Sequence, residues 1–282
     1  MAITTKILDK IGFLRNGSFF LKKPLNNFPD FLGIGAQKSG TTWLYKNLKE
    51  HPEIFLPQTK EIHFFDWYFY KSINWYCSYF RDAKRYQKKG EITPCYSTLS
   101  EEKIKAIQEM NPKLKIILLL RNPIERAWSQ AVMNLSKNNG KVKNFELVDL
   151  FTIIKIATSK RKKDFHLIKK EEFINHFNHS RSIERGNYLK IIKKWSKFFP
   201  ENQIFIGDYN QLQKSPQKLL NRIFTFLDTE LVTDWVNFPL TNRINTTKKD
   251  HTKIPNELYE YLSKMYDKDI KELRKEIPAI KW

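Results

Sequence analysis

Short apolar runs alternate with amphipathic stretches along the chain, and this alternation predicts layers of strands and helices. Residues 31–36 predict a buried strand that ends in glycines. Residues 115–120 predict the strongest strand, because an almost continuous aliphatic run is typical of a parallel strand covered on both faces. A further strand is expected over 203–209. The pattern therefore predicts an α/β fold that contains parallel strands.

Helices are expected between and after these strands. Residues 41–50 predict a helix that stops before Pro52. Asn122 as the N-cap and Pro123 in the first turn predict a helix that runs to about Leu135. Further helices are predicted over 187–199, 216–227 and 255–276, and their apolar stripes are expected in the core: Tyr188, Ile191, Ile192, Trp195 and Phe199 in the first, and Leu258, Leu262 and Tyr266 in the last.

Two segments are expected outside the sheet. Residues 1–29 form an N-terminal extension that is amphipathic and charged throughout, without the apolar segment and cleavage site of a signal peptide. Residues 136–172 form a basic insert of weak periodicity, which we expect to form helices and loops. The longest aliphatic run, 116–120, is far shorter than the ~20 residues that span a bilayer. A cytoplasmic protein is therefore expected.

Composition limits the class of partner. The 41% hydrophobic and 14% aromatic content favours a folded globule. The net charge of +20 favours an anionic partner, which could be a nucleotide, an acidic glycan, a nucleic acid or a membrane surface. Cys77 and Cys95 are too few for a disulfide framework, so free thiols are expected.

The most informative motif is the loop after the first predicted strand. The glycines of 35–40 have the spacing of the phosphate-binding loop G-x-x-x-x-G-K-S/T, but Thr41 replaces its lysine and Lys38 lies within the loop. Backbone N–H groups between a strand and a helix N-terminus favour an anion, and Ser39 and Thr42 can donate hydroxyl hydrogen bonds. The loop alone leaves three possibilities: a degenerate ATP site, a structural turn, or a loop for another phosphate-bearing donor.

A family resemblance narrows this choice. The stretch "QKSGTTWL" (37–44) resembles the 5′-phosphosulfate loop of cytosolic-type and glycan sulfotransferases, whose donor is 3′-phosphoadenosine 5′-phosphosulfate (PAPS). In that family an arginine at a strand end and a serine eight residues later bind the 3′-phosphate, as Arg121 and Ser129 would in "LLLRNPIERAWSQ". The resemblance implies donor contacts from Lys38, Ser39, Gly40, Thr41, Thr42, Trp43 (packing beside the adenine), Arg121 and Ser129.

A second segment carries the implied catalytic chemistry. "QTKEIHFFD" (58–66) resembles the segment that holds the catalytic carboxylate in heparan-type and many bacterial sulfotransferases. The role maps onto Glu61, with His63 as the other candidate base. In an extended segment both side chains would point to the same side. Sulfuryl transfer needs a base to take the acceptor proton, while Lys38 would stabilise charge on the sulfuryl group. No metal is implied.

Two weaker matches extend the resemblance from about residue 30 to the end of the chain. "GEITPCYS" (90–97) resembles a family segment G-E-K-S/T-P-x-Y, but Ile92 and Thr93 stand where glycan enzymes commonly carry a substrate-facing lysine. "NRINTTKKD" (242–250) lies where the family closes a loop over the adenosine, so Arg243 and Lys248 are candidate donor contacts.

The sequence therefore predicts a PAPS-dependent sulfotransferase acting on a hydroxyl or amine of a carbohydrate or small metabolite. The resemblance implies a single α/β domain with a central parallel β-sheet flanked by helices, with the donor across the carboxyl ends of the strands and the basic insert near the acceptor site. The alternatives are a nucleotide-dependent kinase and a non-catalytic polyanion binder. Thr41 and the lack of a clear acidic strand end for magnesium disfavour the kinase. The polyanion binder would show steep salt dependence and little need for Lys38.

Overall fold

The computed structural model describes residues 2–16, 27–137, 168–241 and 253–282. The chain divides into two compact units. The sheet unit comprises Lys6–Arg121 and Tyr188–Asn245, and the helical unit comprises Met1–Thr5, Asn122–Asn187 and Thr246–Trp282. Only the two ends of the basic insert are described. The predicted adenosine loop, residues 242–250, lies entirely outside the described residues.

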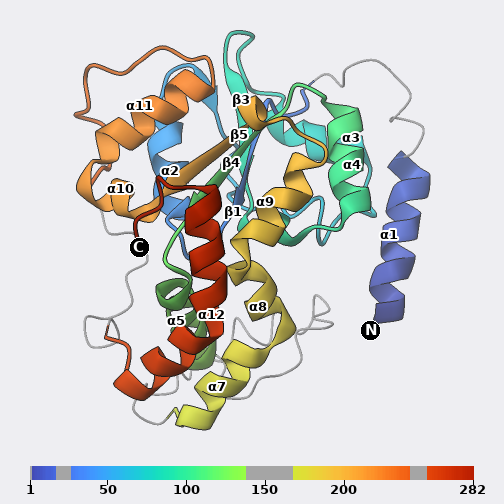
Figure 1. Cartoon of the computed structure of the whole chain (residues 1–282). Helices are drawn as coiled ribbons and strands as arrows, with labels where there is room; N and C mark the ends of the chain where they lie inside the picture. Colours follow the sequence, from blue (N-terminus) through green and yellow to red (C-terminus); the bar gives the residue numbers. More distant parts are fainter. Residues whose placement is uncertain (1, 17–26, 138–167, 242–252) are drawn as a thin grey trace. The chain divides into compact units, whose positions relative to one another are not determined.

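The sheet unit is built on five parallel strands in the order β2-β3-β1-β4-β5, which confirms the predicted parallel α/β sheet (Figure 1). The strands are β1 (Phe31–Gly35), β2 (Ile54–Phe55), β3 (Lys88–Ile92), β4 (Lys115–Leu120) and β5 (Ile204–Asp208). The predicted strands correspond to β1, β4 and β5. The sequence analysis missed β2, which has two residues, and β3, which begins with two lysines.

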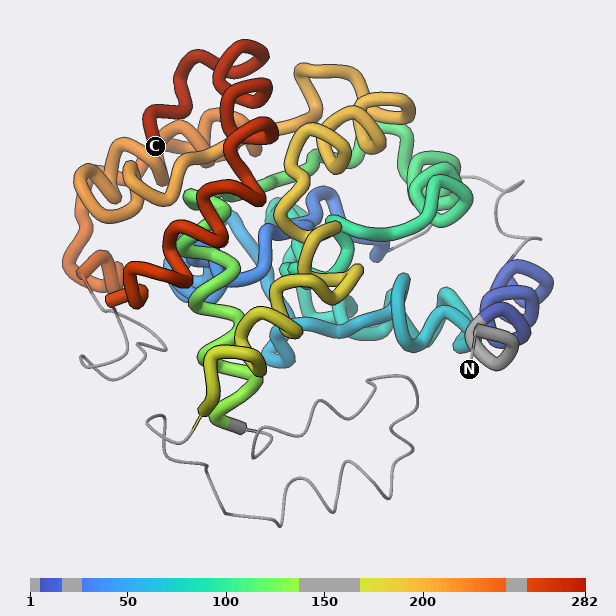
Figure 2. The backbone as a smooth tube through the Cα atoms, turned by 60° about the horizontal axis from the view of Figure 1, so that its bottom comes forward, coloured from blue at the N-terminus to red at the C-terminus, as the bar shows by residue number. Residues whose placement is uncertain are grey.

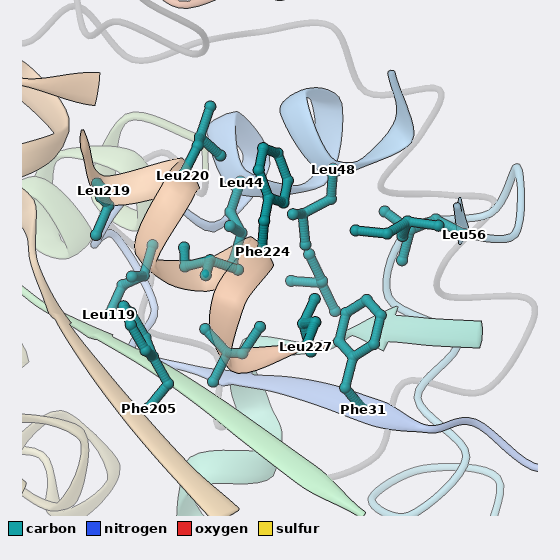
Figure 3. Packing of buried hydrophobic residues seen from close by; sticks show 14 of the residues in the cluster. Phe31, Leu44, Leu48, Leu56, Leu119, Phe205, Leu219, Leu220, Phe224 and Leu227 are labelled. Carbon is teal, nitrogen blue, oxygen red and sulfur yellow. The ribbon is translucent and has the colours of Figure 1, made fainter. Parts of the chain in front are cut away.

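One face of the sheet is covered by α2 (Thr41–Lys49) and α11 (Pro216–Phe226). Figure 3 shows leucine and phenylalanine side chains from both helices meeting strand residues in one apolar cluster. Its fully or almost fully buried members include Phe31, Leu48, Leu119, Leu220 and Phe224. This packing fixes the position of α2, and therefore of the loop that leads into it.

Two other helices, α4 (Glu101–Met110) and α9 (Tyr188–Ser196), pack against each other in the sheet unit. The α9 residues predicted for the core are buried at Tyr188, Ile191 and Trp195, and Phe199 follows just beyond the helix. The unit also contains α3 (Ile73–Cys77), α10 (Tyr209–Lys214) and the 3₁₀ turns η2 (Ser78–Phe80), η3 (Pro94–Thr98) and η5 (Glu201–Gln203). Cys77 and Cys95 are free thiols, as expected.

The helical unit consists of α5 (Pro123–Lys137), α7 (Lys170–Asn178), α8 (Ser180–Gly186) and α12 (Asn256–Glu276), with α5, α7 and α12 side by side (Figure 2). Trp128, Phe173 and Phe177 form its apolar cluster with the predicted α12 stripe of Leu258, Leu262 and Tyr266. Within the N-terminal extension, residues Ala2–Asn16 form the helix α1. In the described parts of the chain, no helix is both long enough and apolar enough to cross a membrane.

Candidate active site

The loops after β1 and β4 lie at the same edge of the sheet, because neighbouring parallel strands end together. They flank the point where the strand order reverses: β3 and β2 lie on one side of β1, and β4 and β5 on the other. Open α/β sheets bind ligands at such a switch point. Sequence motifs far apart in the chain, at residues 35–42 and at Arg121, therefore converge at the expected donor site.

The loop after β1 has the backbone of an anion site. Gly40 is the N-cap of α2 and has φ 89°. Because glycine has no side chain to accept from them, the first-turn N–H groups of α2 remain directed toward the loop. A Cβ at Gly40 would lie 2.5 Å from Leu212 Cδ1. Lys38 also has a positive φ, 71°. Such conformations are costly outside glycine and concentrate at functional sites.

Ser39 supplies a test of whether the loop fits an anionic ligand. The residue is fully buried, and its Oγ has no hydrogen-bond partner among the described residues. A buried hydroxyl without a partner carries a desolvation cost of about 1–3 kcal/mol. A phosphosulfate oxygen is a suitable acceptor for this hydroxyl, so the residues present fit the predicted donor.

Arg121 joins the end of β4 to this loop. Its Nη1 donates a hydrogen bond of 3.3 Å to the carbonyl of Lys38. Its guanidinium stacks 4.6 Å from the centroid of the Tyr209 ring, and its own carbonyl accepts a 2.8 Å hydrogen bond from the Tyr188 hydroxyl. Both the guanidinium and the backbone carbonyl of Arg121 are therefore fixed by contacts. The structure brings together Lys38 and Arg121, which the sequence placed in one site.

Other predicted donor residues have different outcomes. Ser129 lies half-buried on α5 in the helical unit, so its pairing with Arg121 stays a prediction from their spacing. Arg126, one turn earlier, is fully buried and donates to Gln130 Oε1, which gives it a structural role. Arg243 and Lys248 fall outside the described residues.

The predicted role of Trp43 is corrected by the structure. Its indole is only 4% exposed and belongs to the apolar cluster beneath α2 and α11. The indole N–H donates a 2.9 Å hydrogen bond to the carbonyl of Leu240. Stacking on an adenine needs an open ring face. Trp43 therefore packs the core and fixes the segment at Leu240.

The segment of Glu61 and His63 is not extended, so the argument from alternating side chains of a strand does not apply to it. Both residues have positive φ, 63° and 58°, in an irregular turn. Their side chains nevertheless meet, with His63 Nε2 3.6 Å from Glu61 Oε2. Positive φ occurs at five non-glycine residues of the described ranges, and three of them are Lys38, Glu61 and His63. The predicted catalytic residues thus share a strained backbone.

The protonation states in this segment are set by mutual contacts. Burial opposes the charge of Glu61, but the hydrogen bond from His63 and the charge of Lys60 outweigh burial and lower the Glu61 pKa to about 2. Burial also opposes the charge of His63, but Asp66 and Glu61 outweigh it and raise the His63 pKa to about 9. At neutral pH, Glu61 is therefore a carboxylate and His63 an imidazolium.

Two neighbours escaped the sequence analysis as functional residues. Asp66 Oδ2 lies 2.8 Å from His63 Nδ1, and the Trp67 indole stacks on the imidazole with centroids 3.7 Å apart. Asp66 was visible as a nearby acid, three residues after His63. Nothing in the sequence indicated the Trp67 stack, because it depends on the turn at His63.

The motif "GEITPCYS" forms a support beneath the site. Glu91 is fully buried and accepts hydrogen bonds from the hydroxyls of Thr93 (2.6 Å), Tyr96 (2.9 Å) and Tyr76. The Tyr96 hydroxyl in turn accepts the N–H of Phe65 at 3.3 Å. Glu91 is therefore linked to the catalytic segment through the hydroxyl group of Tyr96.

The same motif also contacts β1 up to its last residue, Gly35, where the donor loop begins. The Thr93 N–H donates to the carbonyl of Gly33 at 3.0 Å, and a Cβ at Gly35 would lie 3.1 Å from the carbonyl of Pro94. Ile92 is 1% exposed and packs over Gly33. The positions where glycan enzymes commonly carry a lysine therefore face the core here, and the segment spaces the donor loop from the catalytic segment.

Two further observations bear on the expectations about metals. The predicted absence of an acidic strand end is wrong, because β5 ends at Asp208, whose carboxylate caps α10 through the N–H of Asn210. Ligand atoms of His63, Asp66 and Cys95 lie within 4.8 Å of one another. Since protonated His63 uses Nδ1 to donate to Asp66, that nitrogen cannot also bind a metal in the same state.

Comparison with known proteins agrees with these features. The profile of the family described as "Sulfotransferase domain" matches residues 28–277. The mouse bifunctional heparan sulfate N-deacetylase/N-sulfotransferase 4 is 29% identical over 213 residues, which cover 73% of this chain and 23% of the mouse protein. The mouse heparan sulfate glucosamine 3-O-sulfotransferase 3B1 is 28% identical over 222 residues, covering 77% and 50%. The chain thus spans half or less of these relatives.

Two solved structures share the fold. A sulfotransferase from Alicyclobacillus acidocaldarius aligns with a TM-score of 0.63 at 22% identity, covering 89% of this chain and 96% of that one. The sulfotransferase domain of the curacin biosynthetic pathway aligns with a TM-score of 0.51 at 12% identity, covering 82% and 84%.

Proposed function

Because the chain belongs to the sulfotransferase domain family, we propose that it transfers the sulfuryl group of PAPS to a hydroxyl or amine of a carbohydrate acceptor, with Glu61 as the base. The observation that carries the donor assignment is the link between Lys38 and Arg121 across the switch point of the sheet. The carbohydrate acceptor is proposed from the heparan sulfate relatives.

The donor supplies an activated sulfuryl group, and the chain supplies a preorganised anion site. The first-turn N–H groups of α2, the Ser39 hydroxyl and Lys38 would hold the 5′-phosphosulfate. Arg121, with its fork-shaped guanidinium, would hold the 3′-phosphate. The Tyr209 ring keeps the Arg121 guanidinium in place before the donor binds. These contacts favour a donor that carries an anionic group at each end.

Proton removal is assigned to Glu61. At neutral pH the carboxylate is ionised and can accept a proton, whereas His63 is protonated and cannot. Lys60 pairs with Oε1 of Glu61 in the structure, and its positive charge lowers the basicity of the carboxylate. Loss of the lysine contact raises the basicity of Glu61 toward the range where general bases work well. His63 then orients Glu61, and Asp66 orients His63.

The test is a transfer assay with the purified chain, labelled PAPS and a panel of acceptors. The panel contains unsulfated and N-sulfated heparan-type oligosaccharides, simple aryl glycosides and a tyrosine peptide, and products are identified by mass spectrometry. We expect a carbohydrate product that carries one added sulfuryl group, formed in the presence of a metal chelator. Turnover that requires ATP and magnesium, or label on the peptide alone, would contradict the proposal.

A further inference from the structure

The N-terminal helix α1 has one face docked on the sheet unit. Asp9 pairs with the buried Lys103 at 2.6 Å. Gly12 packs so closely on Phe69 that an added Cβ would lie 2.5 Å from the ring. The side-chain amide of Asn16 donates to the Phe69 carbonyl at 3.1 Å. These contacts fix which side of α1 faces outward.

The opposite face of α1 exposes an apolar stripe. Ile7 is 51% exposed, Ile11 43% and Leu14 83%. Since successive residues turn by about 100° around a helix, these three lie along one line of the surface. They are three of the nine exposed large hydrophobic residues in the described part of the chain, and they stand on a single helix. Such clustering marks an interaction surface.

Basic residues flank this stripe on both sides. Lys6 and Lys10 follow one edge of it and Arg15 the other, and all three residues are exposed, with Arg15 Nη1 donating a 3.1 Å hydrogen bond to the carbonyl of Tyr70. The only acidic residue in the α1 sequence is Asp9, which lies on the docked face and is paired with Lys103. The outward face of α1 therefore combines apolar side chains with positive charge alone.

We propose that α1 binds the surface of an anionic lipid bilayer and lies in the plane of the interface. A helix with an apolar stripe between rows of lysine and arginine is suited to this position, because the stripe enters the acyl boundary while the basic heads remain at the phosphates. Each basic residue near an anionic surface adds electrostatic attraction that falls off within a Debye length. The net charge of +20 adds long-range attraction.

A second copy of the chain fits this face less well. Symmetric pairing of two α1 helices along Ile7, Ile11 and Leu14 would place the basic flanks of one copy beside those of the other. With no acidic residue on either outward face to compensate, these charges would repel. Charge complementarity thus selects an anionic lipid surface.

The proposal is tested by sedimentation of the full chain with vesicles of phosphatidylcholine, with and without phosphatidylglycerol. We expect binding to the anionic vesicles only, weakened at high salt. The double variant Ile11→Asp/Leu14→Asp should bind at least about tenfold more weakly, because it places two carboxylates where two aliphatic side chains would enter the acyl boundary. Both positions are exposed, and thermal melts check that the variant is folded.

The matched control is Leu231→Asp/Val236→Asp, which places the same two charges at residues of the sheet unit that are 58% and 86% exposed. It should bind vesicles as the wild type does. The proposal is overturned if the wild type ignores anionic vesicles, or if the α1 variant binds them as well as the control does. It is equally overturned if the wild type is a dimer that the α1 variant converts to a monomer, because a second copy would then cover this face.

Discussion

Oδ2 of Asp66 lies 2.8 Å from Nδ1 of His63, and this contact keeps the imidazole charged. Burial alone would lower the pKa of His63, yet Asp66 and Glu61 raise it from 6.5 to about 9. A group whose pKa is higher in the folded state stabilises the fold fully below its unfolded pKa and loses that effect as pH rises through the folded pKa. The window for His63 is therefore pH 6.5 to 9.

We expect Asp66→Asn to lower the pKa of His63 and to reduce the loss of stability between pH 6.5 and 9. Each kcal/mol in this window corresponds to about 2–4 °C in melting temperature for a chain of this size. The pKa is measured by NMR titration of the His63 ring, assigned with His63→Asn, and stability by thermal melts at several pH values. A His63 pKa near 6.5 in the wild type would refute the charged imidazole.

Glu61→Gln should slow sulfuryl transfer by ~10²–10⁴-fold, the usual range for a lost general base. Affinity for 3′-phosphoadenosine 5′-phosphate (PAP), the desulfated product, should not change, because Glu61 is assigned to the acceptor side. Turnover is measured under saturating donor, and PAP affinity by calorimetry.

Glu101→Gln is the matched control for this variant. Glu101 also pairs with a lysine, Lys197 at 2.6 Å, so the substitution removes the same kind of ion pair at a site outside the proposed mechanism. We expect wild-type turnover for Glu101→Gln. If Glu61→Gln behaves in the same way, Glu61 is not the base.

The fold could be predicted wherever one segment carried its own signal. The aliphatic run of β4 and the Asn122-Pro123 start of α5 needed no partner, and their boundaries match the structure. β3 was missed because its first residues are lysines and its buried half includes Gly90 and Glu91. Its strand character depends on pairing with β1, which no local pattern reveals.

The residues of the site also divide into those that belong to a local sequence motif and those whose role depends on packing. The glycine loop and Arg121 are contiguous motifs, so the sequence predicted both. Trp43 was assigned to the adenine because an aromatic after the loop suits either an open or a buried position, and only the packing of α11 decides between them. Glu91 could not be recognised as the acceptor of several buried hydroxyl groups, since one of its donors, Tyr76, lies 15 residues away in α3.

Lys38→Ala and Arg121→Ala should each weaken PAP binding by about 10–100-fold, because a hydrogen bond to a charged group is worth about 1.5–3 kcal/mol. Arg121→Lys should fall between Arg121→Ala and the wild type, since lysine keeps the charge but not the two-pronged geometry. Calorimetry with PAP measures all three affinities.

Arg222→Ala is the control for the arginine variants. Its guanidinium also stacks on an aromatic ring, 5.1 Å from the centroid of the Phe205 ring. Arg222 itself belongs to the helix α11. It should bind PAP with wild-type affinity. Wild-type affinity in both Lys38→Ala and Arg121→Ala would disprove the donor assignment.

Tyr96→Phe and Tyr76→Phe separate positioning of the catalytic segment from simple stability. Both rings are fully buried and both hydroxyls donate to Glu91, so each substitution removes one hydrogen bond to the same carboxyl group. We expect each to lower the free energy of unfolding by about 1–3 kcal/mol. Denaturant titration measures this loss.

Only the Tyr96 hydroxyl also accepts the N–H of Phe65, two residues after His63. Tyr96→Phe should therefore lower kcat, leave PAP affinity unchanged and shift the His63 pKa, because the turn that holds Glu61 and His63 loses its anchor. Tyr76→Phe should retain wild-type kcat and His63 titration despite a similar loss of stability. Equal effects of the two variants on kcat would mean that Glu91 acts on the fold as a whole and has no specific link to the catalytic turn.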